Sequence, residues 1–141
     1  MTRAESPLAA RLARAVLRVV ALFYAYGALV HVLNMLSLTG FHWPSAPLKW
    51  QVLDVAYLLL DVVVIAGLLL RWRPGYVAFY LAALSQVVLY TVLRSWILDV
   101  PDAFRVSPEQ AAYLDWLVGF HGVTLVLVSW ALGHGGRTPA R

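Results

Sequence analysis

Hydrophobic side chains dominate four stretches of the chain, residues 15–38, 49–70, 76–98 and 109–132. A helix rises about 1.5 Å per residue, so about twenty apolar residues cross the hydrocarbon core of a bilayer. Short polar segments with proline or glycine separate the four stretches. The pattern therefore predicts an all-α fold, an integral membrane four-helix up-down bundle.

The flanking segments complete the predicted organisation. We expect residues 1–14 to form a cytoplasmic amphipathic segment, residues 15–133 the four-helix domain and residues 134–141 a cytoplasmic tail. The first apolar stretch is too long for a signal peptide and is interpreted as a retained span. Basic residues gather near the first span and in the turn 71–75. On the assumption of a bacterial inner membrane, the positive-inside rule then places both termini in the cytoplasm.

Composition narrows the functions further. Hydrophobic residues make up 62% of the chain and charged residues 13%, and cysteine is absent. Disulfides, thiolate catalysis and cysteine-ligated metal centres are therefore excluded. The net charge of +4 comes from arginines placed as topology determinants, which argues for a lipid bilayer and against a nucleic acid as partner. No serine elbow, phosphate loop or dinucleotide fingerprint is present, which argues against hydrolase, kinase and soluble dehydrogenase chemistry. Enzymatic activity is the least favoured function and no catalytic residue is assigned, with a membrane oxidoreductase acting on quinone kept as an alternative.

Polar side chains inside the apolar stretches form a candidate ligand or proton site. An ionisable group that faces lipid is costly, so these side chains should face protein or water. Counted from the outer ends of the spans, one layer lies about 6–10 Å deep and a second about 15–20 Å deep. The outer layer holds His31, Asp54, Arg94 and Asp115, the inner layer holds Asp61, Gln86 and His121, and Asn34 and Tyr90 lie on the same polar faces.

The layers predict specific pairs. Arg94 should neutralise Asp54 or Asp115, and His31 should hydrogen-bond the other acid, because an unpaired buried charge is unfavourable. Asp61 has no cation at its depth and should therefore be protonated, bonded to Gln86, His121 or a tyrosine, or hydrated from the outer side. Interhelical hydrogen bonding without further function is an equal interpretation for Asn34 and Gln86. For Asp61 a proton or ligand role is favoured, since interhelical bonding does not need an ionisable group.

Two cofactor hypotheses use the same residues. His31 and His121 could act as axial ligands of a b-type haem, although their depths differ by about five residues, or roughly 7 Å. A metal site from His31, Asp54, Asp115 and His121 has suitable ligand types. Asp115 and His121 are six residues apart and do not share a helix face, which weakens the metal hypothesis.

Two segments carry a family resemblance. Residues 11–33, RLARAVLRVVALFYAYGALVHVL, and residues 65–75, IAGLLLRWRPG, resemble the first and second helices of the DoxX-like membrane proteins. Asp61 stands where that family usually has glutamate, and the third and fourth spans match no motif of the family. The resemblance implies a small membrane subunit associated with an oxidoreductase or a quinone-linked electron-transfer complex.

The first functional hypothesis is therefore an accessory subunit that binds other membrane-protein subunits of a larger, redox or quinone-linked complex. Small residues would let neighbouring helices approach closely, at Ala78 and Ala82 and at Gly119 and Gly122. The alternative is a proton-linked transporter, a channel or a small-ligand-binding membrane protein. A haem b protein is the second alternative, and haem b or quinone are the cofactors considered.

Overall fold

Residues 7–134 are described by a computed structural model and contain helices but no strand. The four long helices are α1 (Pro7–Met35), α2 (Leu48–Leu70), α3 (Arg73–Tyr90) and α5 (Pro108–His134). The short helices are η1 (Trp43–Ser45), α4 (Arg94–Leu98) and η2 (Asp102–Phe104). The all-α prediction is confirmed. Within the described residues three helices, α1, α2 and α5, are long and apolar enough to cross a membrane.

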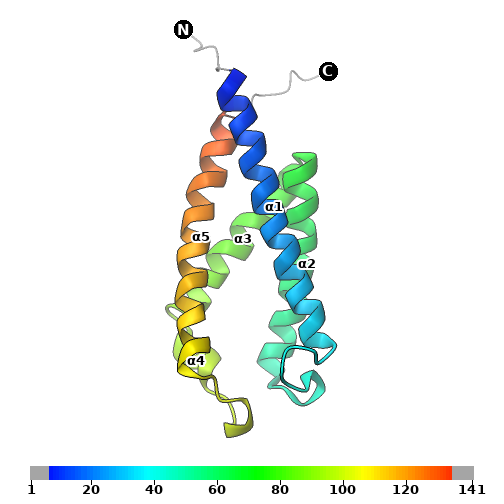
Figure 1. Cartoon of the computed structure of the whole chain (residues 1–141), viewed down its shortest axis with the longest axis vertical. Helices are drawn as coiled ribbons and strands as arrows, with labels where there is room; N and C mark the ends of the chain where they lie inside the picture. Colours follow the sequence, from blue (N-terminus) through cyan, green and yellow to red (C-terminus); the bar gives the residue numbers. More distant parts are fainter. Residues whose placement is uncertain (1–6, 135–141) are drawn as a thin grey trace.

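The four long helices pack in a closed order (Figure 1). α1 lies against α2 and α5, and α3 lies against α2 and α5. The start of α1 and the end of α5 lie at one end of the molecule, and the segments 36–47 and 99–107 lie at the other. We call the first end the terminal half; it holds the apolar core that includes Ala13 and Ala131. We call the second end the loop half; it holds the cavity described below.

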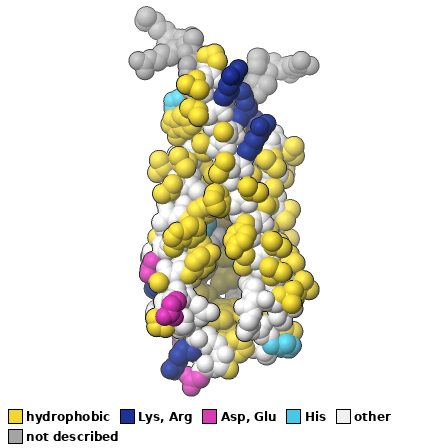
Figure 2. Space-filling view, viewed as in Figure 1, with side chains coloured by type: hydrophobic (Ala, Val, Ile, Leu, Met, Phe, Trp, Pro, Cys, Tyr) yellow, Lys and Arg dark blue, Asp and Glu magenta, His cyan; other side chains and the backbone are white. Residues whose placement is uncertain are grey.

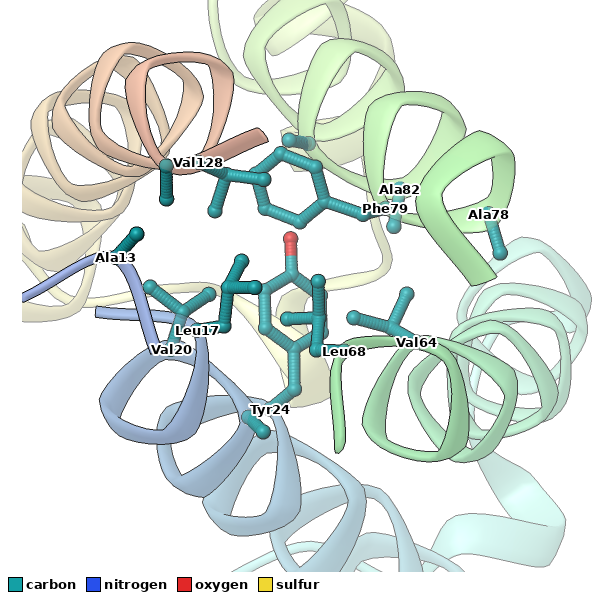
Figure 3. Packing of buried hydrophobic residues seen from close by; sticks show 13 residues of the cluster. Ala13, Leu17, Val20, Tyr24, Val64, Leu68, Ala78, Phe79, Ala82 and Val128 are labelled. Atoms are coloured by element: carbon teal, nitrogen blue, oxygen red, sulfur yellow. The ribbon is translucent and has the colours of Figure 1, made fainter. Parts of the chain in front are cut away.

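The terminal half is filled by small and aliphatic side chains around two aromatic rings. Phe79 is fully buried and packs edge-to-face on Tyr24, with ring centroids 5.7 Å apart. Figure 3 shows side chains of all four long helices converging on this pair. The close approach expected at Ala78 and Ala82 is confirmed, because both are buried here. The remaining core side chains are Ala13, Leu17, Val20, Ala21, Val64, Leu68, Ala83, Val128 and Ala131.

A backbone contact between two glycines joins α2 to α3. A Cβ atom on Gly67 would lie 2.1 Å from the Cα of Gly75, so neither position accepts a side chain. Arg71 ends α2 in the left-handed conformation, with φ 57°, and Pro74 lies in the first turn of α3. The predicted turn 71–75 is therefore shorter, because α3 already begins at Arg73.

Other predicted small-residue contacts and boundaries differ. A Cβ atom on Gly119 or Gly122 would meet no atom within 4 Å, so no other helix of this chain approaches closely there, and the approach of another subunit's helix stays a prediction. Residues 7–14 are continuous with α1 rather than a separate segment, because Ala13 is already packed in the core. The last helix is capped at its start, since Ser107 and Gln110 exchange hydrogen bonds between side chain and backbone.

The predicted third span, residues 76–98, is interrupted. α3 ends at Tyr90, where the Thr91 hydroxyl donates to the Val87 carbonyl at 2.6 Å, and a turn leads into α4. Tertiary contacts replace the lost helical hydrogen bonds. Arg94 donates to the Ala111 carbonyl of α5 at 2.8 Å, and the Trp50 indole of α2 donates to the Ile97 carbonyl at 3.1 Å. The break therefore fastens α4 to two helices at once.

Candidate functional site

A cavity of about 730 Å³ lies in the loop half among the four long helices. Figure 2 shows the molecule hollowed on this face, in the half opposite the start of α1 and the end of α5. Arg94 and Asp115 do not line the cavity. All the other candidate residues from the sequence do: His31, Asn34, Asp54, Asp61, Gln86, Tyr90 and His121.

Asp54 is the most densely bonded carboxylate of the cavity wall. His31 Nδ1 lies 2.8 Å and Asn34 Nδ2 2.9 Å from its Oδ1, and Trp43 Nε1 donates to Oδ2 at 3.0 Å. His31 and Asn34 are three residues apart on α1 and so share one helix face. The predicted bond of His31 to an acid is confirmed. The contact of Trp43 was not predicted, because nothing in its loop sequence indicates a carboxylate partner.

Asp61 lies two helical turns beyond Asp54 on the same face of α2, and its side chain is almost fully buried. Its Oδ2 lies 4.0 Å from Nε2 of His31. Gly27 makes room for this carboxylate, because a Cβ atom there would lie 2.9 Å from the same oxygen. The expected bond to Gln86, His121 or a tyrosine is wrong, and no side chain in residues 7–134 donates a hydrogen bond to Asp61. His31 thus stands between two carboxylates.

The inner end of the cavity carries further polar atoms without partners. His121 Nε2 lies 2.9 Å from Oε1 of Gln86, so the neutral ring donates from Nε2 and keeps Nδ1 as an acceptor. Within the described chain, that Nδ1 and the Tyr24 hydroxyl are buried without a hydrogen-bond partner. Burying such groups is unfavourable unless something bonds to them. Gln86 and His121 do share one layer, as the sequence predicted.

Arg94 and Asp115 form a separate ion pair. The guanidinium bonds both carboxylate oxygens of Asp115 and also the Ala111 carbonyl. The predicted pairing of Arg94 with an acid is confirmed, but Asp115 is largely exposed and the pair joins α4 to α5 outside the cavity. It therefore holds the cavity wall in place and leaves the cavity charge unchanged.

The arrangement of the two histidines does not fit a haem iron. Nδ1 of His31 is bonded to Asp54, and Nε2 of His121 is bonded to Gln86. The remaining Nδ1 of His121 is fully buried, so this ring has no accessible nitrogen for an axial bond. Among residues 7–134, no group of three His, Asp or Glu side chains is placed to hold a metal ion.

Aromatic side chains surround the mouth of the cavity between α1 and α5. Phe23 and Tyr26 line it from α1, and Tyr113 and Trp116 line it from α5. About half of each of these side chains is exposed. Trp116 stacks between Tyr113 and Phe120, with interplanar angles of 11°. Because α1 and α5 are both long and apolar enough to cross a membrane, the mouth opens on a surface suited to lipid.

Comparison with protein-family models, with curated proteins and with solved structures finds no match to this chain. The resemblance to DoxX-like proteins therefore stays a prediction. The candidate site rests on its own geometry: buried carboxylates and a histidine at the inner wall, and aromatic rings at the mouth.

Proposed function

We propose that the protein is an integral membrane four-helix bundle that binds a small, largely apolar molecule in the loop-half cavity. The observation that carries the proposal is the cavity itself, whose 730 Å³ falls in the range of about 300–1,000 Å³ common for small-molecule sites. α3 is the fourth helix of the bundle, shorter than the others because the break at Thr91 redirects the chain.

The distribution of polar groups supports a ligand with two chemically different ends. Asp61 lies at the inner wall, and its carboxylate contacts Nε2 of His31, 4.0 Å away. Phe23 and Trp116 line the cavity at its mouth and are about half exposed. A polar head group would therefore bind at the inner wall, and an apolar body would lie against the aromatic rings.

Charge placement supports an orientation. Arg11, Arg14 and Arg18 are exposed on α1 in the terminal half, and Figure 2 shows basic side chains gathered at that end. In the loop half the described basic residues are fewer, namely Lys49, Arg94 and Arg105. By the positive-inside rule the termini are cytoplasmic and the cavity lies toward the outer leaflet of a bacterial inner membrane.

The test is a photolabelling experiment on the purified full-length protein. The probe is an uncharged long-chain alcohol that carries a diazirine, and labelled residues are mapped by peptide mass spectrometry. We expect saturable labelling at Val30 and Leu117 in the cavity, above the labelling of lipid-facing residues. Val30→Trp should fill the cavity and abolish this labelling.

The matched control is Val19→Trp on the exposed face of the same helix, which should label as the wild type does. Uniform labelling that Val30→Trp does not change would contradict a binding cavity. Mass spectrometry of small molecules that co-purify with the wild type, but not with Val30→Trp, would identify the natural ligand.

The role that the DoxX-like resemblance implies, an accessory subunit of a redox or quinone-linked complex, is a second proposal. A quinone is a membrane-soluble molecule with a polar head and an apolar body, as the cavity requires. A small helical bundle is also compatible with an accessory role in a redox complex. Proton-linked transport would use the same His31 and Asp61 pair. The co-purified molecule and the co-purified proteins distinguish these roles.

A further inference from the structure

We propose that the ligand of this cavity is an amphipathic organic cation, with its positively charged head bound at the Asp61 carboxylate. This inference rests on the proposed binding function and adds the chemical class of the ligand. It follows from three features: the charge of the cavity wall, the lack of a hydrogen bond to the Asp61 carboxylate, and the aromatic rings that surround the cavity.

The cavity wall carries negative charge without enough positive charge to balance it. Two carboxylates line it, Asp54 and Asp61, and no Lys or Arg is among the described lining residues. Arg94 is engaged with Asp115 outside the cavity. Of the two lining histidines, only His31 contacts the carboxylates. A protonated His31 would balance one carboxylate, and a neutral His31 none, so with both carboxylates ionised the wall attracts cations in either state of the histidine.

The two carboxylates differ in the hydrogen bonds that they accept from the protein. Asp54 accepts hydrogen bonds from three side chains and is satisfied without a ligand. Asp61 is 3% exposed, lines the cavity and receives no hydrogen bond from any residue in 7–134. Its ion-pair contact is with Nε2 of His31, at 4.0 Å. A buried carboxylate is costly unless it is paired, and a cationic head would supply that pairing.

Aromatic rings around the space favour the same ligand class. Tyr24, Tyr57 and Tyr90 line the cavity near Asp61, and Tyr113 and Trp116 line its mouth. The faces of such rings attract organic cations, most strongly where water is excluded. The rings also offer apolar surface to the hydrophobic part of the molecule. The wall thus combines a counter-charge with rings that tolerate a bulky, weakly hydrated cation.

The position of the mouth gives such a molecule a route. The opening between α1 and α5 faces the zone that lipid would occupy, and Figure 2 shows it as a hollow flanked by apolar side chains. Amphipathic cations concentrate at the surface of an anionic membrane. They would therefore reach Asp61 from the bilayer, without crossing the polar segments 36–47 and 99–107.

The experiment compares two ions of nearly the same size and shape and of opposite charge. Tetraphenylphosphonium and tetraphenylborate are each equilibrated with the purified full-length protein in an uncharged detergent, and binding is measured by equilibrium dialysis against protein-free micelles. We expect saturable binding of tetraphenylphosphonium only. Asp61→Asn should weaken that binding at least about tenfold, because one partner of a buried charge pair is lost.

Two further variants keep the experiment decisive. Asp102→Asn removes a carboxylate from the exposed segment outside the cavity and should leave binding unchanged. Asp61→Glu keeps the charge and should retain the preference for the cation even if Asp61→Asn does not fold.

Equal binding of the two ions, or a preference for the cation that survives Asp61→Asn, would overturn the inference. Labelling by the uncharged alcohol probe that Val30→Trp abolishes, together with no binding of tetraphenylphosphonium, would overturn the inference and leave the proposed binding function standing. Loss of both would contradict the binding function itself.

Discussion

The terminal half and the loop half are built from the same four long helices, yet one is filled and the other is hollow. On α1 the inward-facing residues change from Leu17 and Val20 in the terminal half to His31 and Asn34 in the loop half. On α2 the same face changes from Val64 and Leu68 to acids. The inward faces of α1 and α2 are thus continuous along both halves, and their side chains change from apolar to polar along the helix.

Tyr24 marks the level at which that change occurs. Its ring packs on Phe79 in the terminal-half core, and it also lines the cavity. Toward the loop half, hydrogen bonds to Asp54 join α1 to α2, and a smaller apolar cluster around Tyr57 and Leu89 packs beside the cavity. Toward the terminal half, small residues such as Ala82 bring the helices together. A solid half gives the hollow half a rigid support, as a preorganised binding site needs.

The largest effect should come from the glycine contact that closes the terminal half. Gly67→Val places a side chain against the backbone of Gly75, which cannot move aside as a flexible side chain would. We expect a loss of at least about 3 kcal/mol in the free energy of unfolding, or no folded protein. Gly119→Val is the matched control, because that position has open space. Thermal unfolding in detergent measures both, and equal losses would contradict the role of the glycine contact.

Phe79→Ala should weaken the terminal half next most strongly. The ring is fully buried, and its removal leaves a cavity that its neighbours cannot fill, at a cost of about 3 kcal/mol. Phe23→Ala at the mouth of the cavity removes the same group from a half-exposed position and should cost about 1 kcal/mol or less. Chemical unfolding of both variants under identical detergent conditions gives the comparison. Similar losses would show that the two halves are packed alike.

Asp54→Asn should produce an intermediate effect in the loop half. The amide turns one acceptor oxygen into a donor that faces existing donors, either His31 and Asn34 or Trp43. Hydrogen bonds to charged groups contribute about 1.5–3 kcal/mol, so a loss of about 2 kcal/mol is expected. Hydrogen exchange should also increase in residues 36–47, which Trp43 fastens to α2. Asp102→Asn is the control, and an equal effect there would show that Asp54 does not organise the wall.

The sequence was sufficient for the apolar helices and for the polar faces that line the cavity. Helical periodicity places Asp54 and Asp61 on one face of α2, and His31 and Asn34 on one face of α1. Depth along the spans correctly indicated that Gln86 and His121 meet. Shared helix faces depend on residue spacing, and equal depths depend on the helical rise per residue, so both can be predicted from a single sequence.

What the sequence could not predict depends on tertiary contacts. The break after Tyr90 follows from bonds that α4 makes with α2 and α5, whereas the apolar pattern alone continues through it. Trp43 reaches Asp54 from a loop whose path no periodicity describes. The two glycine contacts, Gly67 with Gly75 and Gly27 with Asp61, require the spacing between helices to be known.

The smallest effect on stability should come from Gly27→Ala, which separates binding from folding. The added methyl group would lie 2.9 Å from Oδ2 of Asp61, so the carboxylate must move away from its position beside His31. Alanine favours a helix over glycine by about 1 kcal/mol, which offsets part of the crowding. We therefore expect the free energy of unfolding to change by less than about 1 kcal/mol, while binding of tetraphenylphosphonium falls severalfold. Gly119→Ala should show the change in stability without the change in binding. Binding at the wild-type level in Gly27→Ala would mean that the position of the Asp61 carboxylate does not control the cavity, and that the hollow half selects its ligand by shape alone.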